Sequence, residues 1–242
     1  MCTVTFVPLN DKVFITHNRD EKSSRSIAMP PAKYTVNGYT LLFPRDTAAG
    51  GTWIAINNNG AAAVLLNGAF TNHVQQLPYR KSRGLVLLDI VAAADPQLSF
   101  EKTDLNGIEP FTIVLWQQQQ LFECRWDGMH KHVNRLPANL PHTWSSATLY
   151  NQAVLNKRKT WFQQWQQTHT MPTMEDIVQH HMNAGDGDAH NDLRMNRQGQ
   201  MLTVSITSME LSEDKSMMQY TDLCNNTRTL QEFNFTKAGT LQ

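Results

Sequence analysis

The chain has 242 residues, a mass of 27.5 kDa, a formal net charge of zero and a pI near 7.1. This length supports one sizeable hydrophobic core, so we expect a single domain over residues 1–242. The balanced charge argues against a nucleic-acid partner held by electrostatic attraction. No apolar run approaches the ~20 residues of a transmembrane segment, and no signal peptide is visible. Three scattered cysteines without metal-ligand spacing are typical of a reducing compartment, so a cytoplasmic location is expected.

Residues 1–21 predict a β-hairpin. β-Branched and aromatic residues fill 2–7 and 12–16, and Pro8 to Asp11 between them favours a turn. Antiparallel pairing about this turn brings Cys2 beside Arg19 or Asp20, and a shift of one residue exchanges the two. In either register a thiol lies within reach of a cation and a carboxylate.

Cys2 is a candidate nucleophile. Initiator methionine is normally removed before a residue this small, and its removal leaves Cys2 with a free α-amine of pKa roughly 7.7–8.0. This amine can act as a base toward the thiol, and the thiolate is the reactive form of cysteine. The alternative is that Cys2 is only a small apolar strand residue.

A long loop is expected over residues 22–38, because Pro30 and Pro31 interrupt a strand pattern. Three strands are predicted next, at 39–43, 53–56 and 61–66. The last two are joined by an Asn-Gly turn at residues 59–60, which is a strong hairpin signal.

Two glycines precede the second of these strands. Gly50 and Gly51 indicate either a tight turn or a backbone edge that lines a pocket beside the N-terminal thiol. Arg45 and Asp46, just before them, are expected to be a solvated pair rather than part of that pocket.

The next segment predicts two helices and a meander. The more apolar helix, at 82–94, begins at Ser82 as N-cap, ends at Asp95-Pro96 and should form one outer layer. The other elements are a short helix at 98–105 and strands at 111–116, 121–126 and 130–136. Cys124 is expected to be a packed core thiol. His130 and His132 share a strand face but have no further ligand at metal spacing, so they are expected to face solvent.

The remainder of the chain predicts two more helices and further strands. The helix at 149–167 has one apolar, aromatic face that is expected to be core, formed by Val154, Leu155, Arg158, Trp161, Phe162 and Trp165. The second helix starts at a capping box of Thr173 and Asp176. Strands are predicted at 201–208 and 217–223, with further order at 230–235.

Asp and His residues are dense over residues 183–192. The first positions mimic a calcium loop, but its later ligands do not follow, so no metal site is expected. We instead expect a flexible loop over the pocket, with Asp186 or Arg194 touching substrate.

Four motifs occur in one order over roughly the first ninety residues. They are Met1-Cys2, Asn18-Arg19-Asp20-Glu21, Gly50-Gly51-Thr52-Trp53 and Ser82-Arg83-Gly84. In this combination the chain resembles the NRDE family, also called the transport and Golgi organisation family. That family is in turn similar to the N-terminal nucleophile hydrolases of the choloylglycine and penicillin V acylase type. The resemblance implies an α+β fold, a four-layer αββα sandwich.

The resemblance also implies catalytic roles. Cys2 would be the nucleophile, Asp20 would hold its amine, and Arg19 would stabilise the thiolate or orient Asp20. Asn67, at the end of the strand 61–66, would donate to the oxyanion, which requires a fixed N–H about 2.7–3.1 Å away.

Substrate contacts are expected from four further residues, namely Asn18, Gly51, Trp53 and Ser146. The chain departs from the family pattern at Ser145-Ser146, where a Ser-Asn pair is expected. A hydroxyl there can still form hydrogen bonds, but one expected amide donor is missing.

Two functions follow as hypotheses. The first is a cysteine amidohydrolase that acts on a small acyl amide without a metal or cofactor. The second is a non-hydrolytic carrier of haem or a lipid-like molecule on the same scaffold, with His17, Cys2 or methionines touching haem, although the chain has no haem-attachment motif. Both imply a small-molecule ligand, and both leave the oligomeric state open.

Overall fold

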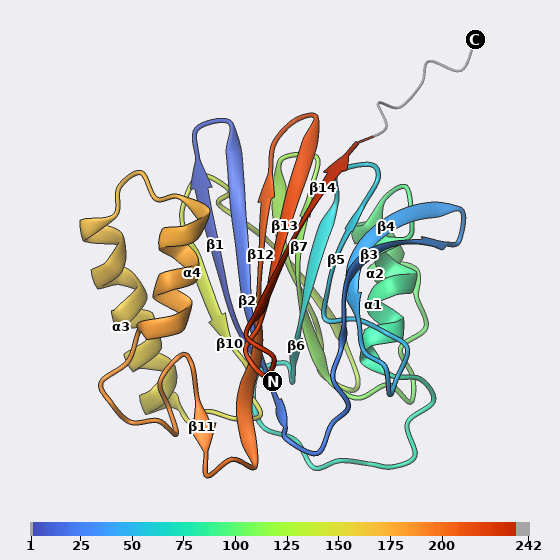
Figure 1. Ribbon diagram of the computed structural model, residues 1–242. Helices are drawn as coiled ribbons and strands as arrows, with labels where there is room; N and C mark the ends of the chain where they lie inside the picture. The colour runs from blue at the N-terminus through green and yellow to red at the C-terminus, as the bar shows by residue number, and fades with distance from the viewer. Residues whose placement is uncertain (1, 236–242) are drawn as a thin grey trace.

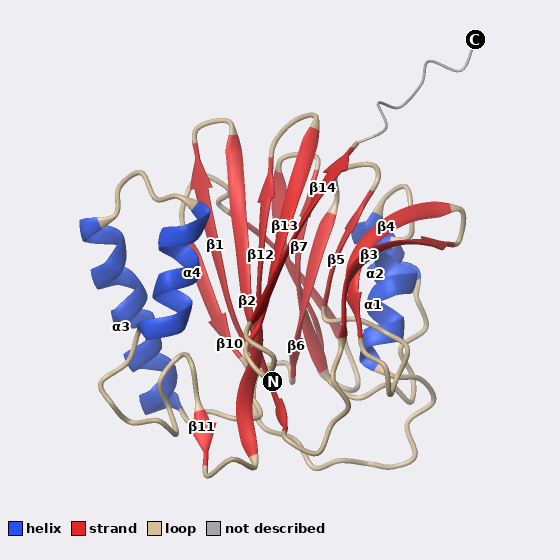
Figure 2. Cartoon of the chain, in the orientation of Figure 1, coloured by secondary structure: helices blue, strands red, loops and turns tan. Residues whose placement is uncertain are grey.

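A computed structural model describes residues 2–235 of the protein, and of Cys2 only the backbone. Its strands form two antiparallel sheets that pack face to face between two pairs of helices (Figure 1). Figure 2 shows the resulting order of layers, with helices outside and strands between them. The four-layer αββα sandwich expected from the sequence is confirmed.

The first sheet combines both ends of the described chain. Its strand order is β10-β1-β2-β12-β13-β14, with β11 paired to β12. The bounds are β1 Cys2–Leu9, β2 Lys12–Lys22, β10 His142–Ser145, β11 Asn196–Arg197, β12 Met201–Leu211, β13 Lys215–Asp222 and β14 Thr227–Asn234. The N-terminal hairpin is therefore present as predicted, whereas β10, which pairs with β1, was not predicted.

The second sheet is a continuous meander, in which each strand pairs with its neighbours in sequence. Its order is β3-β4-β5-β6-β7-β8-β9. The bounds are β3 Met29–Val36, β4 Tyr39–Arg45, β5 Ile54–Asn57, β6 Ala62–Asn67, β7 Phe111–Gln117, β8 Gln120–Trp126 and β9 Lys131–Leu136.

The prediction of a loop over residues 22–38 is wrong, because residues 29–36 form β3. This strand lies at the edge of its sheet, where it pairs only with β4. The register shifts between Met29 and Ala32, around Pro30 and Pro31. Prolines are tolerated at such an edge, because they cannot donate a ladder hydrogen bond but need not do so there.

Four helices cover the outer faces of the sheets. They are α1 Arg83–Val91, α2 Pro96–Lys102, α3 Gln152–Thr168 and α4 Met174–Asn183. The predicted caps at Ser82 and Thr173 are both present, the latter as a capping box with Asp176. Within residues 2–235, none of the helices has the length and apolar content needed to cross a lipid bilayer.

Three apolar clusters hold the layers together. One fills the space between the sheets and includes Val4, Ile15 and Ile54. The second packs α1 and α2 on the meander, and the third packs Phe162 of α3 and Ile177 of α4 on the first sheet. Because successive strand residues point to opposite faces, β2 sends alternate side chains toward the other sheet and toward the helices.

Candidate functional site

The β1–β2 register resolves which residue lies beside the N-terminal cysteine. Position 2 pairs with Arg19, and the pairing continues from Thr3 with Asn18 down to Leu9 with Lys12. The sequence had left Arg19 and Asp20 as alternatives. The side chain of Cys2 lies outside the part of the protein that the structure describes.

A cleft of about 890 Å³ lies beside this end of β2 and is lined by residues from both sheets. Four of the predicted site residues line it, namely Arg19, Gly51, Trp53 and Asn67. The segment of residues 72–84, which leads into α1, contributes much of the remaining wall. Arg19, at 6 % exposure, is nearly buried at the cleft surface.

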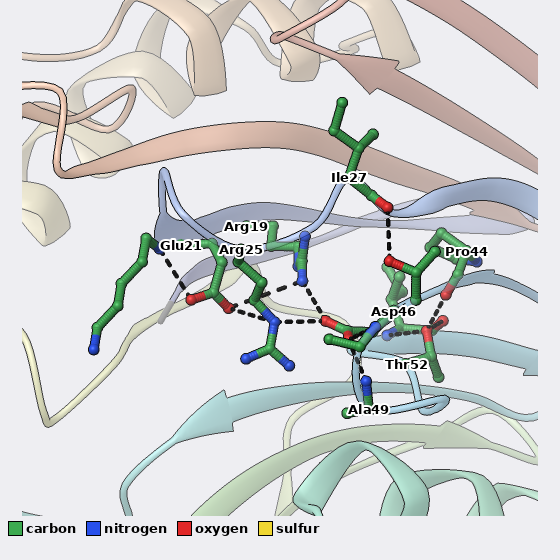
Figure 3. Close-up of polar contacts among 12 residues, drawn as sticks. Arg19, Glu21, Arg25, Ile27, Pro44, Asp46, Ala49 and Thr52 are labelled. Carbon is green, nitrogen blue, oxygen red and sulfur yellow. Dashed lines mark hydrogen bonds and ion pairs between the residues drawn. The ribbon is translucent and has the colours of Figure 1, made fainter.

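Asp46 fixes the position of Arg19 in this wall (Figure 3). Its carboxylate accepts a hydrogen bond from Arg19 Nη2 at 2.5 Å and one from Arg25 Nε at 2.9 Å. Glu21 lies near both guanidinium groups, at 3.8 Å from Arg19 and 3.6 Å from Arg25. The Arg19 guanidinium also lies 4.2 Å above the Trp53 ring, a cation–π contact.

The electrostatics of this cluster favour an ionised Asp46. Burial alone would raise the pKa of the Asp46 carboxyl. The hydrogen bonds from Arg25 and from the Ala49 N–H, with the charges of Arg25 and Arg19, outweigh burial and lower the pKa. Arg25 lines the cleft although no sequence motif indicated it, and the expectation of a solvated Asp46 is wrong, because Asp46 is buried and lines the cleft.

Gly51 forms a wall by close backbone contact. A Cβ at Gly51 would lie 2.5 Å from the carbonyl carbon of Gly84 and 2.6 Å from the Leu85 nitrogen. The Thr52 N–H donates to the Gly84 carbonyl at 3.3 Å. The Gly-Gly-Thr-Trp and Ser-Arg-Gly motifs therefore touch each other. The glycine pair therefore forms a turn, in which Gly50 has a φ of +71°, and a wall of the cleft at Gly51.

Asn67 ends β6 at the cleft. Its backbone carbonyl accepts a hydrogen bond from Ser146 Oγ at 2.7 Å. Within the described residues, the Asn67 side-chain amide forms no hydrogen bond. Ser146 is fully buried and does not line the cleft, so it positions the Asn67 backbone instead of making the expected substrate contact.

Asp20 lies on the opposite face of β2 from Arg19. It is fully buried and accepts hydrogen bonds from Thr203 Oγ1 at 2.7 Å and from Tyr150 Oη at 3.1 Å. Burial raises the pKa of Asp20 above its ordinary value, against the lowering effect of the Arg158 charge and of the two hydrogen bonds. The carboxylate is thus enclosed, and it does not line the cleft.

Asn18 is also directed away from the cleft. Its amide nitrogen donates to the backbone carbonyls of His181 at 3.1 Å and Leu193 at 2.8 Å, and its oxygen contacts His181 Nδ1 at 2.6 Å. The predicted substrate contact of Asn18 finds no support in this geometry. The side chain instead joins β2 to α4.

The loop at 183–192 does not cover the cleft. Asp186 pairs with Lys157 of α3 at 2.7 Å, and neither Asp186 nor Arg194 lines the cleft, so that expectation is wrong. Among the described residues, no group of three or more His, Cys, Asp or Glu side chains is arranged to hold a metal ion.

The two described thiols differ from a reactive cysteine. Cys124 is buried in the core beneath α1 and α2, as predicted, and burial raises its pKa to about 12. Cys224 is exposed, and partial desolvation of its thiol, together with the charge of Asp222, raises its pKa. A raised pKa reduces the thiolate fraction and therefore nucleophilicity near neutral pH.

Solved structures share this fold at low sequence identity. A cysteine-to-alanine mutant of conjugated bile acid hydrolase from Clostridium perfringens matches with a TM-score of 0.61 and 11% identity, over 98% of this chain and 97% of that chain. An arginine-to-leucine variant of the same enzyme matches with a TM-score of 0.59 and 10% identity, over 100% and 98% of the two chains.

The Caenorhabditis elegans ortholog of N-acylethanolamine-hydrolyzing acid amidase matches with a TM-score of 0.59 and 12% identity, over 86% of this chain and 92% of that chain. No curated protein is significantly similar in sequence. The model of the family described as Transport and Golgi organisation 2 matches residues 1–236. The chain therefore belongs to the Transport and Golgi organisation 2 family and has the fold of N-terminal nucleophile hydrolases.

Proposed function

We propose that the protein is a cysteine amidohydrolase that cleaves a small acyl amide, with Cys2 as its nucleophile. The observation that carries the proposal is the β1–β2 register, which sets position 2 opposite Arg19 at the cleft. The scaffold supports it, since the similar structures are named as a hydrolase of conjugated bile acids and an acid amidase.

The chemistry begins with removal of Met1, which frees the α-amine of Cys2. The amine accepts the thiol proton, and the thiolate attacks the amide carbonyl carbon to form a tetrahedral intermediate. The Asn67 side-chain amide, with a backbone N–H, donates to the oxyanion. The C–N bond then breaks, and the leaving amine takes the proton from the α-ammonium group.

The second half of the reaction regenerates the enzyme. Water, deprotonated by the Cys2 amine, attacks the thioester carbonyl, and the acyl group leaves as a carboxylic acid. Asp20 accepts a hydrogen bond from the α-ammonium form of the amine and holds it in place. Arg19, pinned by Asp46 and Trp53, supplies positive charge near the thiolate, and Gly51 and Trp53 form the walls that confine the substrate.

The test is hydrolysis of a panel of N-acyl amino acids and simple N-acyl amides by the Cys2→Ala variant. We expect the variant to lose activity by about 10³-fold or more, because no other group replaces the nucleophile. Cys224→Ala is the matched control, since it removes an exposed thiol elsewhere and should leave the rate unchanged. Intact mass of the wild-type protein should show loss of Met1.

The proposal fails if Cys2→Ala hydrolyses the panel as fast as wild type. The comparisons give the carrier alternative no support. Titration of the wild-type protein with haem, in the same experiment, tests that alternative directly. Saturable one-to-one haem binding without any hydrolysis would replace the hydrolase with a carrier.

A further inference from the structure

Arg158 of α3 is a buried cation whose hydrogen bonds reach two separate segments of the chain. Only 2 % of it is exposed. Its Nη1 donates to Thr3 Oγ1 of β1, its Nε to the Asn191 carbonyl at 3.1 Å, and its Nη2 to the Asp192 carbonyl at 2.7 Å. No ion pair joins it to a carboxylate within the described residues. A buried charge is costly unless its surroundings compensate it, so this arrangement calls for an explanation.

Tyr150 lies between Arg158 and Asp20. The guanidinium carbon of Arg158 lies 3.8 Å from the centroid of the Tyr150 ring, which is a close cation–π contact in a desolvated setting. The hydroxyl of the same ring donates to Asp20 Oδ2 at 3.1 Å. A buried cation and a buried carboxylate thus contact the same side chain: the cation lies over the Tyr150 ring, and the carboxylate accepts from its hydroxyl.

We propose that Arg158 is a positioning residue, which acts through Tyr150 to keep the Asp20 carboxylate ionised and correctly oriented, and through Thr3 to hold the strand residue that follows Cys2. The importance of this for catalysis rests on the proposed function, in which Asp20 holds the Cys2 amine. Arg158 itself does not line the cleft and does not contact substrate in this scheme.

The other groups packed around Asp20 either favour its ionised form or carry no charge. Thr203 of β12 donates to its second oxygen, and Arg197 of β11 lies 5.6 Å from the Tyr150 ring. His181 of α4, which faces the neighbouring Asn18, is kept neutral because burial lowers its pKa. Burial raises the pKa of Asp20, and the positive charge of Arg158 opposes that rise. Removing this charge should therefore raise the pKa of Asp20 further.

The first experiment measures the titration of the Asp20 carboxyl carbon by ¹³C NMR. The Asp20→Asn variant assigns its resonance, because that signal is lost in the variant. Arg158→Met, which keeps the stem and removes the charge, should raise the Asp20 pKa by about one pH unit. Arg228→Met is the matched control, because Arg228 is exposed and pairs with Glu175 on the surface. The acid limb of hydrolysis should move upward by the same amount in Arg158→Met, and this shift should disappear in the Asp20→Asn background.

A second variant keeps the test valid if Arg158→Met does not fold. Tyr150→Phe retains the ring under the guanidinium and removes only the hydroxyl, so it should also raise the Asp20 pKa. An unchanged Asp20 titration in the folded variants, whatever their stability, would overturn the inference. A different outcome is that no protein, wild type included, hydrolyses the panel while the Asp20 pKa still shifts in the variants. This outcome would reject the proposed function and leave the link from Arg158 to Asp20 in place.

Discussion

Arg19 and Asp20 are neighbours on β2, yet they lie in different surroundings. Arg19 faces the cleft, where Asp46, Arg25 and Glu21 form an ionic cluster that reaches solvent. Asp20 lies on the opposite face, where it is fully buried and accepts hydrogen bonds from Tyr150 and Thr203. The difference teaches that one strand presents a charge to the cleft on one face, while residues of its other face, such as Asn18, form buried hydrogen bonds to distant segments. We therefore expect changes on the enclosed face to cost more stability than changes in the ionic cluster.

The largest loss is expected from Asn18→Leu on the enclosed face. The substitution leaves two backbone carbonyls and His181 Nδ1 without their buried partner. We expect the free energy of unfolding to fall by about 3–4 kcal/mol, measured by urea denaturation at pH 7. A loss below that of Asp46→Asn would break the comparison between the two faces.

Gly51→Ala tests whether the cleft wall depends on backbone contact and not on charge. Its new Cβ would collide with the backbone of Gly84, which cannot move without shifting the start of α1. We expect a loss of about 3 kcal/mol in the free energy of unfolding, at the upper end for overpacking. Gly187→Ala is the control without a steric clash, since nothing lies within 4 Å of a Cβ there, although its φ of +89° adds backbone strain. A loss in Gly51→Ala no larger than in this control would show that the contact with Gly84 is not what matters.

His180, which is buried on the helix side of the first sheet, makes the stability of this face depend on pH. It packs against Phe162 and Trp165, and burial, followed by the nearby charge of His169, lowers its pKa to about 4 from 6.5. Between these values the unfolded chain binds a proton that the folded protein does not, so stability falls as the pH drops below 6.5. From pH 7 to 5 the loss is about 2 kcal/mol.

Urea denaturation at pH 7 and pH 5 measures this loss. His180→Phe should reduce the difference between the two pH values, whereas the same change at the exposed His130 should not. An undiminished pH dependence in His180→Phe would mean that other groups cause the acid sensitivity.

The smallest effect on stability is expected for Asp46→Asn. Asp46 accepts hydrogen bonds from the nearly buried Arg19 and from the partly exposed Arg25. Because asparagine keeps one of the two acceptor oxygens and the cluster reaches solvent at the cleft, the loss at pH 7 should be about 1 kcal/mol. The pKa of Asp46 is lowered in the folded protein, so its contribution is present above the ordinary value of 3.8 and is lost as the pH falls through the folded pKa. The difference between wild type and variant in urea denaturation should therefore shrink as the pH is lowered below 3.8. A difference that does not shrink would show that the carboxylate charge is not responsible.

Local signals in the sequence were sufficient for much of this fold. The capping box of Thr173 and Asp176, the N-cap at Ser82 and the N-terminal hairpin depend on residues a few positions apart, and all three are present. Edge strands were harder to predict, because β3 contains prolines and β10 is short and pairs only with β1. Their identity depends on partners that a local pattern does not contain.

The site shows the same limit. The motifs indicated Arg19, Gly51, Trp53 and Asn67, and the structure brings these four to one cleft. Asp46 was wrongly expected to be solvated, because its partners are 21 and 27 positions away and leave no local signal. Arg158 was placed on the apolar stripe of its helix, but its contacts with Thr3, Tyr150 and the carbonyls of 191–192 come from distant segments, so no periodicity could indicate its role.

The two sheets also differ in when they can form during synthesis. The meander β3–β9 spans residues 29–136 and pairs neighbours in order, so it can fold as it leaves the ribosome. The β1–β2 hairpin must wait for β12, which begins at residue 201, before its second edge is covered. We therefore expect the strands of the meander to pair before the first sheet is complete. In a nascent chain stalled before residue 201, the inner apolar face of the meander, which includes Ile54 and Val64, would still lack β12 on the opposite side of the core.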